Sequence, residues 1–223
     1  MAYAVLRKED FNIDYFNDKA KVVIVGISPG PSQKGVYDPN LTVKENNRKC
    51  AFRGNTSIQN NLSRMLNYIG INTYLKIDDC SKLWEKTYFE LVNFTSIFPF
   101  SVLEGVPQDT DRYTNDEAER NKSKVKFISS ITYKEMMKSD LLQKQFKKFL
   151  DHVEQYKNNP IYIACGASVY DVLNACESMK GKTIIPIVHP SGVNNERVSL
   201  YCDDEITPIQ FRKEAREKMK ELI

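Results

Sequence analysis

The sequence lacks several features that would place it in a special class of protein. No stretch approaches the roughly 18 apolar residues that a membrane helix needs, and the first ten residues contain no apolar signal region. The five cysteines are an odd number, widely spaced and without a CxxC pair. This pattern argues against a disulfide framework and against a zinc or iron–sulfur site of the usual spacing. We expect reduced, mostly buried thiols, no metal or other cofactor, and a soluble cytoplasmic protein without membrane contact.

Length and composition favour one globular domain. The chain has 223 residues, of which 41% are apolar and 27% charged. We therefore expect a monomer with a single domain over residues 1–223 and insertions near 32–55 and 101–133. The formal net charge of +3 is too small to indicate a partner. Basic residues do outnumber acidic ones within 120–148, which would attract a phosphate backbone, although such residues more often only solvate helix surfaces.

Apolar patterning predicts the fold class. Runs rich in β-branched and aromatic residues predict strands at 22–25, 88–100, 160–164 and 183–188. Helical spacing of apolar residues predicts helices at 56–69, 80–89, 133–157, 167–173 and 208–223. We expect a short helix or arm over 1–20, a long loop over 32–55 and an extended piece at 71–75. Strands that alternate with helices imply a three-layer α/β/α sandwich around a central, mostly parallel four-stranded sheet.

Three of these strands end in polar loops, at 26–31, 93–95 and 189–193. The carboxyl ends of parallel strands share one edge of a sheet, so we expect the loops to meet in one crevice. A histidine, an amide and a glycine-rich loop together can read a flat polar ligand and stabilise negative charge on a carbonyl oxygen. The amide of Asn93 is equally consistent with a structural bracket for backbone groups.

The motifs in these loops resemble those of the uracil-DNA glycosylase superfamily. GISPG at 26–30 is similar to the family's first motif, a strand that ends in a G-x-x-P-G or G-x-D-P-Y loop. HPSGV at 189–193 is similar to its last motif, in which an apolar wedge follows His-Pro-Ser. VNFTSIFPF, around Asn93, and IYIACGASVYDVL resemble the strand and the strand–helix unit between them. The similarity keeps the family's order and extends from residue 21 to about 197.

The resemblance implies a DNA glycosylase that flips uracil or another damaged or modified base out of DNA and hydrolyses its N-glycosidic bond without a metal. It assigns roles to twelve residues, which are catalytic (His189, Ser28, Asn93), base-binding (Gly26, Ile27, Phe52, Asn93) and DNA-binding (Pro29, Gly30, Ser32, Ser191, Gly192, Val193). In these roles Phe52 would stack on the base, His189 would stabilise its carbonyl, and Val193 would wedge into the duplex. Phe52 and Val193 are equally consistent with simple packing.

One departure from the family leaves the activity open. Where active members commonly carry Asp, Glu or Asn to orient the attacking water, this chain has Ile27 and Ser28. A serine hydroxyl is a far weaker base than a carboxylate. Either leaving-group stabilisation at His189 carries catalysis, or a carboxylate elsewhere helps, with Asp38 the nearest candidate, or the chain is an inactive nucleic-acid-binding protein. A small-nucleotide enzyme is a further alternative, but the first loop has no GxGxxG or Walker pattern.

Overall fold

A four-stranded parallel sheet lies at the centre of the protein. The computed structural model describes all residues except 1, 7–10, 53–55, 122–123 and 205–209. The sheet has the order β3-β2-β7-β8, and its strands are β2 (Val22–Gly26), β3 (Val92–Ser96), β7 (Ile161–Cys165) and β8 (Ile184–Ile187). Val23 of β2 pairs with Asn93 on one side and Tyr162 on the other. Every residue of β2, β7 and β8 is buried, as continuous apolar runs predict for strands that are covered on both faces.

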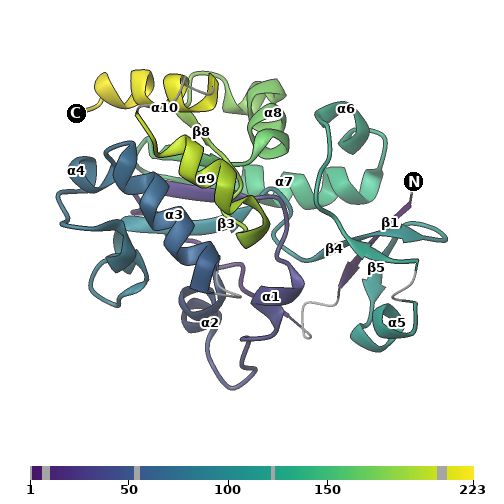
Figure 1. Cartoon of the computed structure of the whole chain (residues 1–223). Coiled ribbons are helices and arrows are strands. Elements are labelled where there is room, and N and C mark those ends of the chain that lie inside the picture. The colour runs from purple at the N-terminus through teal and green to yellow at the C-terminus, as the bar shows by residue number, and fades with distance from the viewer. Residues whose placement is uncertain (1, 7–10, 53–55, 122–123, 205–209) are drawn as a thin grey trace.

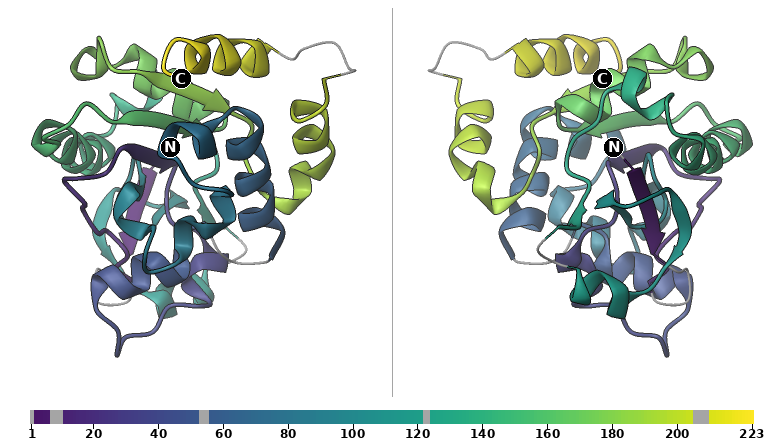
Figure 2. Two further views of the ribbon diagram at one scale, coloured as in Figure 1. Left: turned by 90° about the vertical axis from the view of Figure 1, so that its left-hand side faces the viewer. Right: turned by 90° about the vertical axis from the view of Figure 1, so that its right-hand side faces the viewer.

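Helices cover both faces of this sheet. On one face Val23 and Tyr162 share a core with α7 (Asp140–Gln155) and α8 (Ala167–Ala175). On the other, Val22 and Ile24 pack with α3 (Thr56–Tyr68), α9 (Asn195–Tyr201) and α10 (Gln210–Lys220). Figure 2 shows α9 (yellow-green) beside α3 (dark blue), with α10 (yellow) above them. These layers confirm the predicted α/β/α sandwich.

A second, mixed sheet lies beside the first (Figure 1). Its order is β5-β1-β4-β6, with β1 (Ala2–Leu6), β4 (Val102–Val106), β5 (Thr110–Tyr113) and β6 (Lys126–Phe127), and α5 (Asn115–Arg120) follows β5. The prediction of a helix or arm over 1–20 is therefore wrong at its start. Ala4 pairs with Leu103 of β4, and a partner so distant leaves no trace in local sequence. The range 101–133 supplies the other three strands of this sheet.

The range 32–55, predicted as a loop, contains α1 (Pro31–Lys34, which begins one residue earlier) and α2 (Val43–Cys50). A capping box between Thr42 and Glu45 begins α2: the Thr42 hydroxyl accepts the N–H of Glu45, and the Glu45 carboxylate accepts the N–H of Thr42. This Thr-x-x-Glu signature is present in the sequence and marks the helix that the loop prediction missed.

Three other predicted elements differ from the structure. The piece at 71–75 is a helix, α4 (Ile71–Leu75), because Gly70 at φ +90° lets the chain turn directly out of α3. The predicted helix 133–157 is divided into α6 (Tyr133–Met136) and α7, because the extended Ser139 accepts the N–H of Leu142 and caps a new helix. The segment 80–89 forms 3₁₀ turns in place of the predicted α-helix. Among the described residues, the 3₁₀ turns are η1 (Cys80–Trp84), η2 (Phe89–Leu91), η3 (Glu177–Met179) and η4 (Gly192–Asn194).

All five thiols are free, and four of them are buried. Among the helices that the structure describes, none is long and apolar enough to cross a membrane.

The same substitution at two valines tests how much the central strand contributes to stability. Val23 of β2 has no exposed surface, whereas Val193 is 96% exposed. We expect Val23→Ala to lower the free energy of unfolding by about 1.5–3 kcal/mol, because it removes two buried methyl groups and leaves a cavity. Val193→Ala should change it by less than about 0.5 kcal/mol. Urea denaturation followed by circular dichroism measures both, and equal effects would contradict the buried position of β2.

Candidate active site

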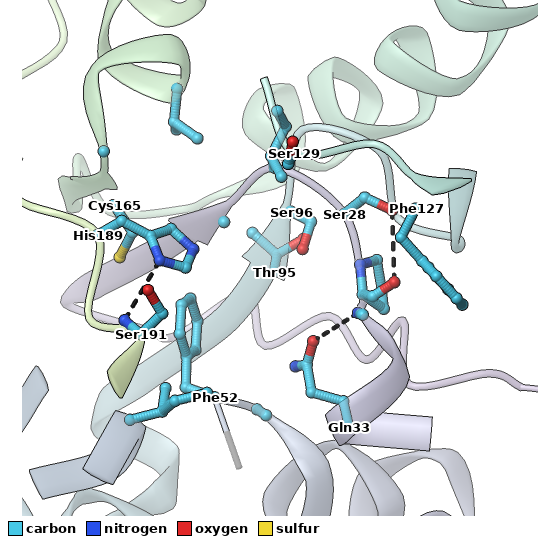
Figure 3. A pocket seen from close by; sticks show the side chains of 18 of the residues that line it. Ser28, Gln33, Phe52, Thr95, Ser96, Phe127, Ser129, Cys165, His189 and Ser191 are labelled. Carbon is cyan, nitrogen blue, oxygen red and sulfur yellow. Dashed lines mark hydrogen bonds between the residues drawn. The ribbon is translucent and has the colours of Figure 1, made fainter. Parts of the chain in front are cut away.

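A cavity of about 530 Å³ opens at the carboxyl ends of the parallel strands. Its wall includes the ends of β2 and β3, the turn after β7 and the histidine that follows β8, together with Phe52 from the segment after α2. Figure 3 shows Ser28, Phe52, Thr95 and His189 around this space. The strand ends therefore converge as their parallel order predicts.

His189 presents a neutral N–H group to the cavity. Its Nδ1 accepts the backbone N–H of Ser191 at 3.3 Å, which places the ring proton on Nε2. The imidazole is exposed to the cavity (Figure 3), but the surrounding protein desolvates it and lowers its pKa from 6.5. Gly166 packs against the ring: its φ is +99°, and a Cβ there would lie 3.4 Å from the His189 Cβ. The ring is thereby held as an uncharged hydrogen-bond donor.

Phe52 provides a flat surface beside this donor. Its ring lies against Gly26, where an added Cβ would be 3.4 Å from the Phe52 Cζ. Phe94 supports the ring at 6.0 Å between centroids, and Trp84 stacks on Phe94 at 4.9 Å. Trp84 also donates Nε1–H to the carbonyl of Ala51 at 2.9 Å, which holds the chain just before Phe52. Phe52 itself adopts the left-handed φ of +51°, a strained conformation that concentrates at functional sites.

The hydroxyl of Ser28 is engaged with the backbone next to the second sheet. Its Oγ accepts the N–H of Val102 at 2.9 Å and lies 3.4 Å from the carbonyl of Phe100. The carbonyl of Pro29 accepts the hydroxyl of Ser101 at 2.8 Å, and the N–H of Gly30 donates to Gln33 Oε1 at 2.9 Å. These bonds shape the first loop, and they leave Ser28 poorly placed to activate a water.

Asn93 does not line the cavity. It lies on the face of β3 that is turned toward α7, where its Nδ2 donates to the Tyr156 hydroxyl at 2.6 Å. Of the two roles that the sequence left open, this position corrects the expectation of a base reader and supports a structural role. The next polar residues, Thr95 and Ser96, lie nearer the end of the strand and do line the cavity. The sequence could have indicated Thr95 and Ser96 as cavity residues, because they are the last polar residues of the strand before the loop.

The other predicted residues divide into a cavity group and a rim group. The cavity wall contains nine of them: Gly26, Ile27, Ser28, Pro29, Gly30, Ser32, Phe52, His189 and Ser191. Gly192 and Val193 belong to η4, outside the cavity, and the Val193 side chain projects from the surface.

Asp38, the carboxylate that the sequence offered as a possible aid to catalysis, lies outside the cavity. Asp38 accepts the N–H of Asn40 at 3.0 Å, and this bond lowers the pKa of its carboxyl group. Its other oxygen lies 3.6 Å from Lys49 Nζ, and the residue does not line the cavity. Asp14 is instead the one acidic residue at the cavity wall within the described ranges, and no local pattern in the sequence indicated it.

No group of three or more potential metal ligands occurs among the residues that the structure describes.

Comparison with known proteins places the chain in one family. The family model for the uracil DNA glycosylase superfamily matches residues 13–211, which include the whole parallel sheet and the cavity. No curated protein and no solved structure matches the chain. Because this match covers most of the 223 residues, the chain belongs to the uracil DNA glycosylase superfamily.

Proposed function

We propose that the protein is a monofunctional DNA glycosylase, which hydrolyses the N-glycosidic bond of uracil or another damaged or modified base after flipping it into the cavity. The observation that carries the proposal is the neutral Nε2–H of His189, which faces the same space as the Phe52 ring. A base that stacks on Phe52 can present a carbonyl oxygen to this donor.

The chemistry that these residues support is dissociative. As the bond from C1′ to the base nitrogen breaks, its electron pair passes into the base, and the carbonyl oxygen becomes negative. The Nε2–H of His189 stabilises that oxygen by a hydrogen bond, in a cavity where such bonds are stronger than in water. A water then adds to C1′ and loses a proton, which leaves an abasic deoxyribose, and the departed base gains a proton from solvent.

Leaving-group stabilisation carries most of the rate in this proposal. The Ser28 hydroxyl already binds the N–H of Val102 and is a weak base. The same observation favours the alternative, an inactive protein that binds nucleic acid and keeps the fold. Turnover separates the two functions, because both proteins would bind DNA in a salt-dependent way.

The first prediction concerns the contribution of His189 to cleavage. We expect His189→Ala to lower the single-turnover rate by about 10²–10³-fold, the usual loss when one oxyanion donor is removed. Alkaline cleavage of labelled oligonucleotides that carry uracil, hypoxanthine, xanthine or 5-hydroxymethylcytosine measures the rate, and circular dichroism checks folding. Unchanged rates in the variant would exclude this role, whereas binding without product from any substrate would support the inactive alternative.

The second prediction concerns the state of the His189 ring. We expect a pKa below 6.5 and the Nε2–H tautomer, so that the ring is neutral at pH 7 and gains charge only as the pH falls below that lowered pKa. Long-range ¹H–¹⁵N NMR measures both properties, and His189→Gln assigns the signals because the chain has two histidines. A pKa at or above 6.5, or a proton on Nδ1, would contradict the proposed donor.

A further inference from the structure

The cavity wall beside β3 contains an amide whose hydrogens are both used. Asn47 lies in α2 and is 1% exposed. Its Nδ2 donates to the carbonyl of Ile13 at 2.5 Å and to that of Phe94 at 3.0 Å. These two bonds determine the orientation of the amide, so that only its oxygen remains for another partner.

The amide oxygen of Asn47, Oδ1, is a buried hydrogen-bond acceptor without a donor among the described residues. Asn47 Oδ1 receives no hydrogen bond from the part of the chain that the structure describes, although the residue lines the cavity. Buried polar atoms almost always have a partner, so an orphan at a cavity wall indicates a water or a ligand that supplies the hydrogen.

A carboxylate lines the same cavity. Asp14 directly follows Ile13, whose carbonyl Asn47 binds, and its side chain lines the cavity at 14% exposure. Asp14 Oδ1 lies 3.9 Å from His152 Nδ1 on α7. No lysine or arginine lines the cavity within the described ranges. A carboxylate offers oxygen acceptors, as the Asn47 amide oxygen does, and we name Asp14 and Asn47 the acceptor wall.

The acceptor wall lies toward the β3 edge of the sheet, and His189 lies toward the opposite, β8 edge. His189 packs against Gly166 at the end of β7, whereas Asn47 binds the backbone of β3, and the strand order is β3-β2-β7-β8. A base whose carbonyl meets His189 therefore turns another edge toward the acceptor wall. The cavity volume of about 530 Å³ leaves room for a purine or a substituted pyrimidine.

We infer that Asp14 and Asn47 determine specificity, and that they select a base with an amino group at the edge remote from His189, as in cytosine-type and guanine-type bases. An amino group offers hydrogens to both oxygens. The matching oxo bases, of the uracil and hypoxanthine types, lack that amino group, and a 4-oxo pyrimidine places a carbonyl acceptor against two acceptors. The inference rests on the proposed function, because it assumes that the cavity holds a flipped base.

Two comparisons, each between an amino base and its oxo analogue, test the selection independently of cleavage. The probes are single-stranded oligothymidines that carry one test base: 5-hydroxymethylcytosine against 5-hydroxymethyluracil, and guanine against hypoxanthine. Fluorescence anisotropy with His189→Gln measures binding while turnover is slowed. We expect the amino member of each pair to bind about tenfold or more tightly, since a site built to accept a hydrogen bond discriminates strongly against an analogue without the donor. Equal or tighter binding of the oxo members would overturn the inference.

A second variant tests the assignment to Asp14. Asp14→Asn has nearly the same shape but places an amide that can donate at the wall, so the preference for amino bases should disappear or reverse. Asp38→Asn is the matched control, because that carboxylate lies outside the cavity, and it should keep the preference. A preference that Asp14→Asn leaves unchanged would also overturn the inference.

Cleavage by the wild-type protein separates this inference from the proposed function. Cleavage of oxo bases at least as fast as their amino partners would leave the glycosylase standing and reject the acceptor wall. Selective binding of amino bases without cleavage of any probe would support the acceptor wall and reject the glycosylase.

Discussion

The parallel pairing of β2 with β3 on one side and β7 on the other is the constraint on which the site depends. β2 is wholly buried, so its carboxyl end is the point at which the chain leaves the core. Because its neighbours run in the same direction, their ends and the loop that holds His189 open into the same cavity. Loops from distant parts of the sequence are thereby brought to one place by a rigid scaffold.

Buried amides attach the outer segments to this scaffold. Asn17 donates to the carbonyls of Glu90 and Val92, and Asn47 binds Ile13 and Phe94, so that the segment before β2 follows the edge strand β3. Each of these amides satisfies backbone carbonyls that a sheet edge leaves without a strand partner. The same attachments carry Asp14 to the cavity and place Phe52, which follows α2, beneath it.

The parallel sheet could be predicted because continuous apolar runs such as 22–25 and 183–188 are typical of strands that are buried on both faces. His189 and the first loop could be predicted because motif and strand end coincide. β1 could not, since its partners lie about a hundred residues away in β4. Asn93 was misplaced because it lies two residues deeper in β3 than Thr95, which shares its face and does line the cavity, and the sequence alone does not say at which residue of a strand the cavity begins. Asp14 was missed because its segment is held by contacts with residues distant in the sequence, such as the side-chain bonds that Asn17 and Asn47 make.

The central claim is that a neutral His189 stabilises the base as it leaves from its stack on Phe52. A crystal structure of the protein with an oligonucleotide whose target nucleotide carries a 2′-fluorine, and so resists cleavage, tests it most directly. The account predicts the base in the cavity against Phe52, with a carbonyl oxygen within about 3 Å of His189 Nε2. A base that stays in the helix, or that occupies the cavity without reaching His189, would contradict it.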